Sequence, residues 1–328
     1  MDISVIICTF NRRKNLEECV AHVMAQRSLQ GRAWEIVLVD NNSTDGTREA
    51  VRKLEERYGS RILYVFEGNQ GLSHARNRGI RATDSRYVAF IDDDILVAPD
   101  WLGAIVEAFE TTGADAVGGC IHVQSPTPLP AWILPEMYGF LGHRDFGPEP
   151  FFMDGVTQFP FGGNMAFSRR MIDRVGLFDT RMGRKGTGLR REELFKGEET
   201  DYFQRIVSEG GRIYYEPRAA VHHKILPHQL RKAFFRTLHF NAGYQKGVLD
   251  PDDYGRRVLG VPAFIFRQTL RAAARYVYQL AAMGPSRAFR QQMTVGYFVG
   301  MIFGYRDRAR NRNALRAAAP DAGKDDGS

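Results

Sequence analysis

Three consecutive carboxylates, Asp92, Asp93 and Asp94, follow an apolar run over residues 87–91 that is typical of a buried strand. Adjacent acids repel one another unless a positive group lies among them. Carboxylate oxygens are preferred ligands of Mg²⁺ and Mn²⁺, and Mg²⁺ commonly joins one or two carboxylates to substrate phosphates. The cluster therefore predicts a divalent metal that holds a diphosphate. From these residues alone, a solvated acidic turn before a helix is the alternative.

A second pair of acids, Glu198 and Glu199, lies in GEETDYFQR, just before a predicted helix over residues 200–208. A positioned carboxylate can take the proton of an attacking hydroxyl group. The alternative is that both acids only stabilise the positive end of the helix. Asp201 and Arg205 lie one turn apart on this helix, and we expect them to support the base or an acceptor.

The elements that must position these acids alternate between apolar runs and amphipathic segments. Strands are predicted over residues 3–9, 35–39, 62–66 and 87–91, and helices over 15–26, 47–58, 71–81 and 101–112. This alternation predicts an α/β fold with a mostly parallel central sheet flanked by helices. Open α/β sheets bind ligands at the carboxyl edge of their strands. Asp40, which follows the second strand, is expected at the same edge as the acid cluster.

Charge divides the 328-residue chain, whose formal net charge is +7. Residues 1–223 carry 27 Lys or Arg against 31 Asp or Glu, whereas residues 224–316 carry 17 against 4. The basic part is expected to attract phosphates or lipid head groups. Cys8, Cys19 and Cys120 form no CxxC pair, which argues against a disulfide framework and a zinc site. Without the layout of a signal peptide at the N-terminus, a cytoplasmic location is expected.

The basic part contains a predicted amphipathic helix on which Arg267, Arg271 and Arg275 share one face. We interpret it either as an ordinary helical appendage of the catalytic domain or as a peripheral contact with an anionic membrane through residues 258–305. The second interpretation places the protein at the inner face of the plasma membrane.

An apolar run over residues 293–305 follows, with Gly296, Gly300 and Gly304 at four-residue spacing. It is shorter than the roughly 20 residues that a spanning helix needs. The small face predicts close helix packing, either within the chain or in a homodimer.

Six segments now support a family resemblance: SVIICTFNR, EIVLVDNNSTDGT, NQGLSHARNRGI, YVAFIDDD, FGGNMAFSRR and GEETDYFQR. In this order they resemble the family 2 glycosyltransferases, inverting enzymes with the Rossmann-like A-type nucleotide-sugar-binding fold. The resemblance covers residues 2 to 240. With the change in charge, it predicts a catalytic domain over 1–240, a basic helical region over 241–316 and a disordered tail over 317–328.

The resemblance implies a donor site built from several segments. Thr9, Asn11 and Asp40 match positions at the nucleoside base, and Arg76 matches one near the base and ribose. The acid cluster matches the family's DxD motif, with Asp92 and Asp93 toward the ribose and sugar. The residues implied to bind the nucleotide-sugar are thus Thr9, Asn11, Asp40, Arg76, Asp92, Asp93, Gly163 and Asn164.

The resemblance also implies a metal and a base. Asp94 is implied to hold Mn²⁺ or Mg²⁺ against the two phosphates, with a histidine after a later strand completing the site. His223 is favoured over His222 for that ligand. The family usually shows Glu-Asp where this chain has Glu198-Glu199. Glu199 takes the place of the catalytic base, and the choice between the two glutamates stays open.

The predicted function is transfer of a sugar from a nucleotide-diphospho-sugar, with UDP as the commonest base in the family, to a glycan or polyprenyl-linked acceptor in cell-envelope or exopolysaccharide synthesis. The alternatives are a catalytically silent nucleotide-sugar-binding protein and a nucleotidyltransferase. The segment CTFNRRKN lacks the glycines of a dinucleotide-binding loop, which argues against a nicotinamide dehydrogenase. No nucleic-acid-binding module is recognised, so no nucleic-acid partner is expected.

Overall fold

The computed structural model describes residues 1–27, 29, 31–186, 197–250 and 254–318. The predicted tail lies outside these residues from 319 onward. The chain forms two compact units, one from Met1–Leu129 with Ile133–Gln229 and one from Pro130–Trp132 with the chain from Leu230 onward. The functional division at residue 240 stays a prediction.

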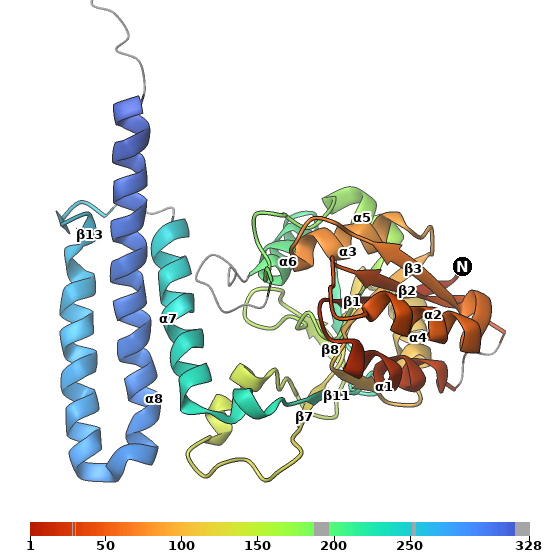
Figure 1. Ribbon diagram of the computed structural model, residues 1–328, viewed down its shortest axis with the longest axis horizontal. Helices are drawn as coiled ribbons and strands as arrows, with labels where there is room; N and C mark the ends of the chain where they lie inside the picture. The colour runs from red at the N-terminus through yellow and green to blue at the C-terminus, as the bar shows by residue number, and fades with distance from the viewer. Residues whose placement is uncertain (28, 30, 187–196, 251–253, 319–328) are drawn as a thin grey trace, which may run out of the picture. The chain divides into compact units, whose positions relative to one another are not determined.

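The first unit contains an 8-stranded sheet in the order β3-β2-β1-β4-β9-β6-β10-β8 (Figure 1). Neighbours among β3, β2, β1 and β4 are parallel, whereas β9 is antiparallel to β4 and β6, and β8 is antiparallel to β10. The predicted α/β fold with a mostly parallel core is therefore confirmed. The strands are β1 (Ile3–Thr9), β2 (Trp34–Asp40), β3 (Ile62–Phe66), β4 (Tyr87–Asp92), β6 (Ala116–Gly118), β8 (Phe151–Met153), β9 (Met165–Ser168) and β10 (Ile213–Tyr215).

Helices cover both faces of this sheet, because the buried strands carry apolar residues on each side. Val5 and Ile7 of β1 belong to the core that includes α1, α2 and α4, whereas Ile6 belongs to the core that includes α3, α5 and α6. The two helical layers lie on opposite sides of the sheet in Figure 1. The helices are α1 (Arg13–Met24), α2 (Thr47–Tyr58), α3 (Leu72–Arg81), α4 (Trp101–Thr112), α5 (Arg169–Val175) and α6 (Glu198–Ser208).

Strand register brings the polar strand ends together. Thr9 lies opposite Asp40, and Cys8 lies opposite Asp92. After β4, a short turn carries the remaining acids into β5 (Ile95–Val97), which belongs to a small second sheet in the order β5-β11-β7. In it, β11 (Val221–Lys224) pairs with β5 and with β7 (Ile121–Gln124), and His223 lies opposite Ile95. This pairing brings a histidine strand beside the acid turn.

The second unit is helical, as predicted for the C-terminal extension. α7 (Lys232–Leu249) packs against α8 (Ala263–Ala318), which is interrupted at Gly284, where φ is 77°, and continues after it as a second segment (Figure 1). Among the helices that the structure describes, none combines the length and apolar composition that crossing a membrane requires. The remaining short elements are β12 (Arg257–Val258), β13 (Val261–Pro262), η1 (Gly59–Arg61), η2 (Pro135–Leu141) and η4 (Pro227–Leu230).

The glycines of the predicted small face differ in what they contact. A Cβ atom at Gly300 would lie 2.0 Å from the carbonyl oxygen of Phe240 in α7, and one at Gly304 would lie 2.2 Å from that of Tyr244. A Cβ atom at Gly296 meets nothing within 4 Å. Two of the three glycines therefore allow close packing within the chain.

We expect Gly300→Ala to destabilise the second unit by about 1–3 kcal/mol, because the methyl group forces α7 and α8 apart. Gly296→Ala is the matched control, and we expect it to stabilise the helix by up to about 1 kcal/mol through helix propensity. Amide hydrogen exchange in α7 measures the effect directly. Equal protection of α7 in both variants would contradict the prediction.

Candidate active site

The acid turn at the end of β4 is buried and bonded to the end of β1. Thr9 Oγ1 donates a hydrogen bond of 2.7 Å to Asp93 Oδ2. Asp93 and Asp94 are 3% and 5% exposed. Burial and the neighbouring carboxylate of Asp94 raise the pKa of Asp93 to about 7. So many acids in one buried turn need a cation nearby.

Arg12 supplies positive charge among these acids, and sequence reasoning missed it. Its Nη1 atom lies 3.1 Å from Asp93 Oδ1 and 2.6 Å from Asp94 Oδ2. The sequence could have indicated Arg12, because this residue follows the first strand in CTFNR and that strand ends at the same edge of the sheet as the acids. The guanidinium of Arg12 therefore explains how the carboxylates of Asp93 and Asp94 can lie close together despite their repulsion.

Asp94 also faces His223 through an oxygen that has no hydrogen-bond partner among the described residues. That buried oxygen, Oδ1, lies 3.5 Å from His223 Nε2. The other ring nitrogen, Nδ1, lies 2.7 Å from the carbonyl oxygen of Leu141 and so fixes the ring. Burial alone would raise the pKa of Asp94, but His223 and Arg12 lower it to about 2. A carboxylate oxygen without a partner and an oriented imidazole are groups that can hold a divalent metal.

The two histidines that the sequence left open lie on opposite faces of β11, as strand geometry requires. His223 faces Asp94, whereas the ring of His222 is exposed and lies 5.7 Å from the ring of His122. In the part of the chain that the structure describes, no group of three or more His, Cys, Asp or Glu residues could hold a metal ion. A metal at Asp94 and His223 would thus need ligands from a substrate, and Mg²⁺ sites commonly take them from phosphates.

Arg76 joins the acid turn to the second pair of acids. This side chain from α3 is 1% exposed, and its Nη1 atom lies 3.1 Å from Glu198 Oε1. Its Nη2 atom lies 3.9 Å from Asp92 Oδ1 and 3.8 Å from Glu199 Oε1. Acids that are separated by about a hundred residues in sequence therefore surround one guanidinium. A contact of Arg76 with the base or ribose stays a prediction.

The two glutamates at the start of α6 have different surroundings. The side chain of Glu198 is 4% exposed, and that of Glu199 is 25% exposed. Burial, followed by the neighbouring charge of Glu199, raises the pKa of Glu198 to about 7. Of the two glutamates, only Glu199 therefore lies near Arg76 and is also accessible to another molecule.

The two glycines of the FGGN segment lie beside the acids of the site. A Cβ atom at Gly162 would lie 2.3 Å from Glu199 Oε1, and one at Gly163 would lie 3.5 Å from Asp92 Oδ2. The absence of a side chain at Gly162 therefore leaves room for Glu199, whereas a Cβ atom at Gly163 would make only an ordinary contact with Asp92.

Asn164, by contrast, is fully buried. Its Oδ1 atom accepts a hydrogen bond from Trp101, and its Nδ2 atom donates to the carbonyl oxygens of Cys120 and Ala219. In this arrangement the side chain of Asn164 connects parts of the core, and its place in the nucleotide-sugar site stays a prediction.

The residues expected at the nucleoside hold two loops at this edge. Asn11, at a φ of 53°, accepts a hydrogen bond of 2.7 Å from the backbone of Thr44. Asp40 is 2% exposed and accepts hydrogen bonds from the backbone of Ser43 and from the hydroxyl group of Tyr64. These bonds fix the loops after β1 and β2, and their predicted role at the base remains untested.

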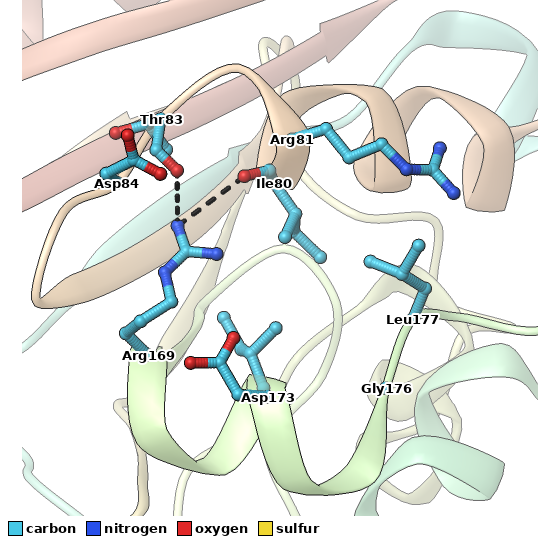
Figure 2. Close-up of a pocket in the computed structure, with 9 residues that line it drawn as sticks. Ile80, Arg81, Thr83, Asp84, Arg169, Asp173, Gly176 and Leu177 are labelled. Carbon is cyan, nitrogen blue, oxygen red and sulfur yellow. Dashed lines mark hydrogen bonds between the residues drawn. The ribbon is translucent and has the colours of Figure 1, made fainter.

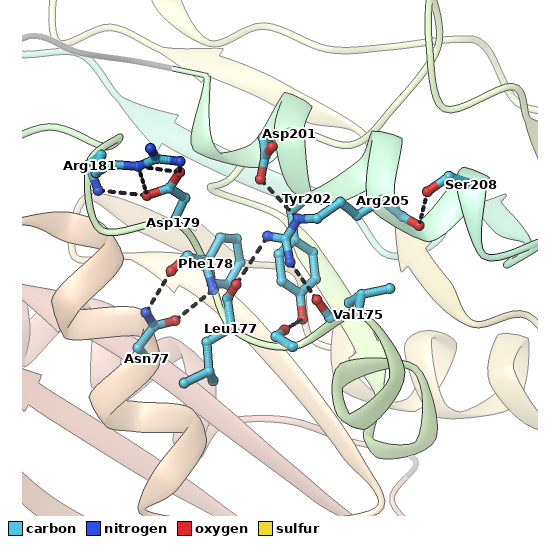
Figure 3. Close-up of polar contacts among 11 residues, drawn as sticks. Asn77, Val175, Leu177, Phe178, Asp179, Arg181, Asp201, Tyr202, Arg205 and Ser208 are labelled. Atoms are coloured by element: carbon cyan, nitrogen blue, oxygen red, sulfur yellow. Dashed lines mark hydrogen bonds and ion pairs between the residues drawn. The ribbon is translucent and has the colours of Figure 1, made fainter. Parts of the chain in front are cut away.

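Arg205 fixes α6 to the loop after α5 (Figure 3). Its guanidinium lies 3.0 Å from Asp201 Oδ2 and donates hydrogen bonds to the carbonyl oxygens of Val175 and Leu177. Tyr202 adds a hydrogen bond to the carbonyl oxygen of Gly176. Asp201 and Arg205 therefore support the helix that carries Glu198 and Glu199, and their predicted contact with an acceptor remains untested.

One pocket of the first unit lies at a different place. It has a volume of about 300 Å³. Thr83 and Asp84, which precede β4, line it (Figure 2), whereas the acids lie at the other end of β4. Arg169 lines it and donates hydrogen bonds to the carbonyl oxygens of Thr83 and Ile80. None of the predicted site residues lines this pocket, so we assign it no part in the chemistry.

Comparison with known proteins identifies relatives of this chain. Residues 4–176 match the family described as glycosyl transferase family 2. The glucosyl-dolichyl phosphate glucuronosyltransferase of Haloferax volcanii is 30% identical over 259 residues, which cover 76% of this chain and 78% of that protein. The succinoglycan biosynthesis protein ExoM of Rhizobium meliloti is 27% identical over 251 residues, which cover 76% of this chain and 75% of that protein.

A solved structure has the same fold. The mannosyltransferase PcManGT from Pyrobaculum calidifontis, in complex with GDP-Man and Mn²⁺, superposes with a TM-score of 0.60 at 20% identity. The superposition covers 94% of this chain and 88% of that chain. At this identity the likeness shows the fold alone.

Proposed function

This chain belongs to glycosyl transferase family 2 and is a glycosyltransferase, and on that premise we propose that it is a metal-dependent, inverting enzyme. It transfers a sugar from a nucleotide-diphospho-sugar, expected to be a UDP-sugar, to a glycan or lipid-linked acceptor in cell-envelope or exopolysaccharide synthesis. The observation that carries this proposal is the arrangement around Arg76, which places the acid turn and Glu199 around one guanidinium.

The donor lies at the carboxyl edge of the sheet. The nucleoside lies against Thr9, Asn11 and Asp40, and the diphosphate lies at Asp94. Asp94 and His223 would hold the cation, Mn²⁺ or Mg²⁺. The Oδ1 atom of Asp94, which has no hydrogen-bond partner among the described residues, and the oriented ring of His223 support this assignment. When bound, the ion offsets the charge that develops on the diphosphate leaving group.

Glu199 acts as the catalytic base on the acceptor. Inversion at the anomeric carbon requires a carboxylate on the side opposite the leaving diphosphate, to take the proton of the acceptor hydroxyl group. Glu199 is the more exposed of the two glutamates, whereas Glu198 is bonded to Arg76. Glu198 then positions Arg76, and Asp201 and Arg205 hold α6.

The acceptor class is proposed from the relatives. The first relative is named for a dolichyl phosphate sugar and the second for succinoglycan biosynthesis. A dolichol-phosphate mannosyltransferase of Pyrococcus furiosus matches 36% of this chain at 33% identity. We therefore propose a lipid-linked or polysaccharide acceptor. We also propose a cytoplasmic site of action and, separately, a homodimer.

The test is a donor screen with UDP-, GDP- and dTDP-sugars, each with Mn²⁺, with Mg²⁺ and with a chelator. One nucleotide is expected to raise the unfolding free energy by about 2.7 kcal/mol at a hundred times its Kd, and only with metal. Release of that nucleoside diphosphate in the presence of polyprenyl phosphates or envelope glycans then shows transfer, and NMR of the product gives the anomer. Stabilisation without any transfer would favour the silent binder, and no stabilisation by any donor would overturn the proposal.

A further inference from the structure

The second unit contains a long stretch without negative charge. Residues 254–306 include no Asp, Glu or Lys, and all of their basic residues are arginines. A partner of this stretch is therefore expected to be anionic. The arginines are Arg256, Arg257, Arg267, Arg271, Arg275, Arg287, Arg290 and Arg306.

Three of these arginines form a strip on the first segment of α8. Arg267, Arg271 and Arg275 recur every four residues, so they follow one face of the helix, and all three are exposed. Within the described part of the chain, no ion pair joins them to a carboxylate. Their charge is therefore available to another molecule.

Leu270 and Tyr278, each three residues after an arginine of the strip, lie beside it, and Val277, seven residues after Leu270, extends the apolar edge. Leu270 is 72% exposed, Val277 is 63% exposed and Tyr278 is 71% exposed. The opposite side of the same helix is buried, since Ile265 and Ala272 are 0% and 6% exposed. The outward apolar residues thus do not serve the packing of the unit. We call Arg267, Leu270, Arg271, Arg275, Val277 and Tyr278 the outer face of α8.

A pocket continues the basic strip between the two segments of α8. It has a volume of about 370 Å³, and Arg271 and Arg275 line it together with Gln268, Gln291 and Thr294. The two guanidinium groups and the amide of Gln268 are donors that suit a phosphate oxygen. The hydroxyl group of Thr294 and the amide of Gln291 donate to the carbonyl oxygens of Arg290 and Ala272.

We propose that the outer face of α8 binds the surface of an anionic membrane. Leu270, Val277 and Tyr278 enter the acyl boundary, while the arginines and the pocket contact phosphate head groups. Nucleic acids and acidic polysaccharides satisfy the charge, but neither provides an apolar phase for the exposed Leu270 and Val277. This inference goes beyond the proposed glycosyl transfer and does not rest on it.

The test is sedimentation of the full chain with vesicles of phosphatidylcholine alone or mixed with phosphatidylglycerol. Wild type is expected to bind the mixed vesicles, and the binding is expected to weaken at high salt. The variant Arg267→Gln/Arg271→Gln/Arg275→Gln is expected to bind roughly a hundredfold more weakly, since each arginine near such a surface contributes about fivefold. Leu270→Gln/Val277→Gln is expected to lose the binding that remains at high salt.

The matched control removes three exposed arginines of the first unit, as Arg52→Gln/Arg57→Gln/Arg174→Gln, with the same change in net charge. It is expected to bind like wild type. Equal loss in this control, equal binding to phosphatidylcholine alone, or no binding by wild type would overturn the proposal. So would a dimer in sedimentation velocity that only Leu270→Gln/Val277→Gln dissociates, because the face then serves self-association. All variants are expected to keep any stabilisation by donor, which separates this result from the fate of the proposed function.

Discussion

Asp94→Asn is expected to lower kcat/KM by roughly a thousandfold, because a catalytic metal supplies several kcal/mol of charge stabilisation. The substitution keeps the size of the side chain and removes the negative charge that faces His223 and Arg12. Isothermal titration calorimetry with Mn²⁺ in the presence of donor is expected to show weaker metal binding. This readout does not depend on turnover.

The control for this variant is Asp84→Asn, which changes an exposed acid beside the pocket at the opposite edge of the sheet. It is expected to leave metal binding and turnover unchanged. If Asp94→Asn binds Mn²⁺ and donor as tightly as wild type does, Asp94 is not a metal ligand. The carboxylate would then be required only as the partner of Arg12.

Glu199→Gln is expected to lower kcat by about 10²–10⁴-fold, the range typical of a lost general base. Its amide keeps the shape of the side chain and cannot accept the proton of the acceptor. Donor affinity is expected to stay within a few-fold of wild type, because Asp94 and His223 are unchanged. Turnover with saturating acceptor, together with donor binding by thermal shift, measures the two effects separately.

Glu198→Gln is the matched substitution one residue away. Since Glu198 is buried against Arg76, this variant is expected to lose less turnover than Glu199→Gln. A larger loss of kcat in Glu198→Gln, with donor binding intact, would transfer the role of base to Glu198. The pair of variants thus resolves the choice that the Glu-Glu sequence left open.

Local sequence pattern was sufficient for the four parallel strands β3, β2, β1 and β4 and for much of the functional edge that they form. The buried strand before Asp92 and the short strand before Asp40 are apolar runs, and parallel pairing alone brings their ends together. The start of α6 was predicted within two residues, because its acids and amphipathic pattern are local features.

Contacts between distant segments were not predictable in this way. Arg12 and Asp94 are 82 positions apart, and their contact depends on how the loop after β1 lies over the turn after β4. His223 approaches Asp94 only because β11 pairs with β5 in a small sheet that has no strong sequence pattern. For Asn164, a polar residue after two glycines can serve a ligand or the core equally well, and only tertiary packing shows the hydrogen bonds that its side chain makes.

The position of Arg76 has a consequence for how this site can change in evolution or design. Asp92, Glu198 and Glu199 share one buried positive charge, so a change in any of them alters the electrostatic balance of the others. Double-mutant cycles across this group are therefore expected to be non-additive. The donor side and the base side of the site cannot be optimised one at a time, and a graft of this chemistry into another scaffold has to carry the shared arginine with its three acids.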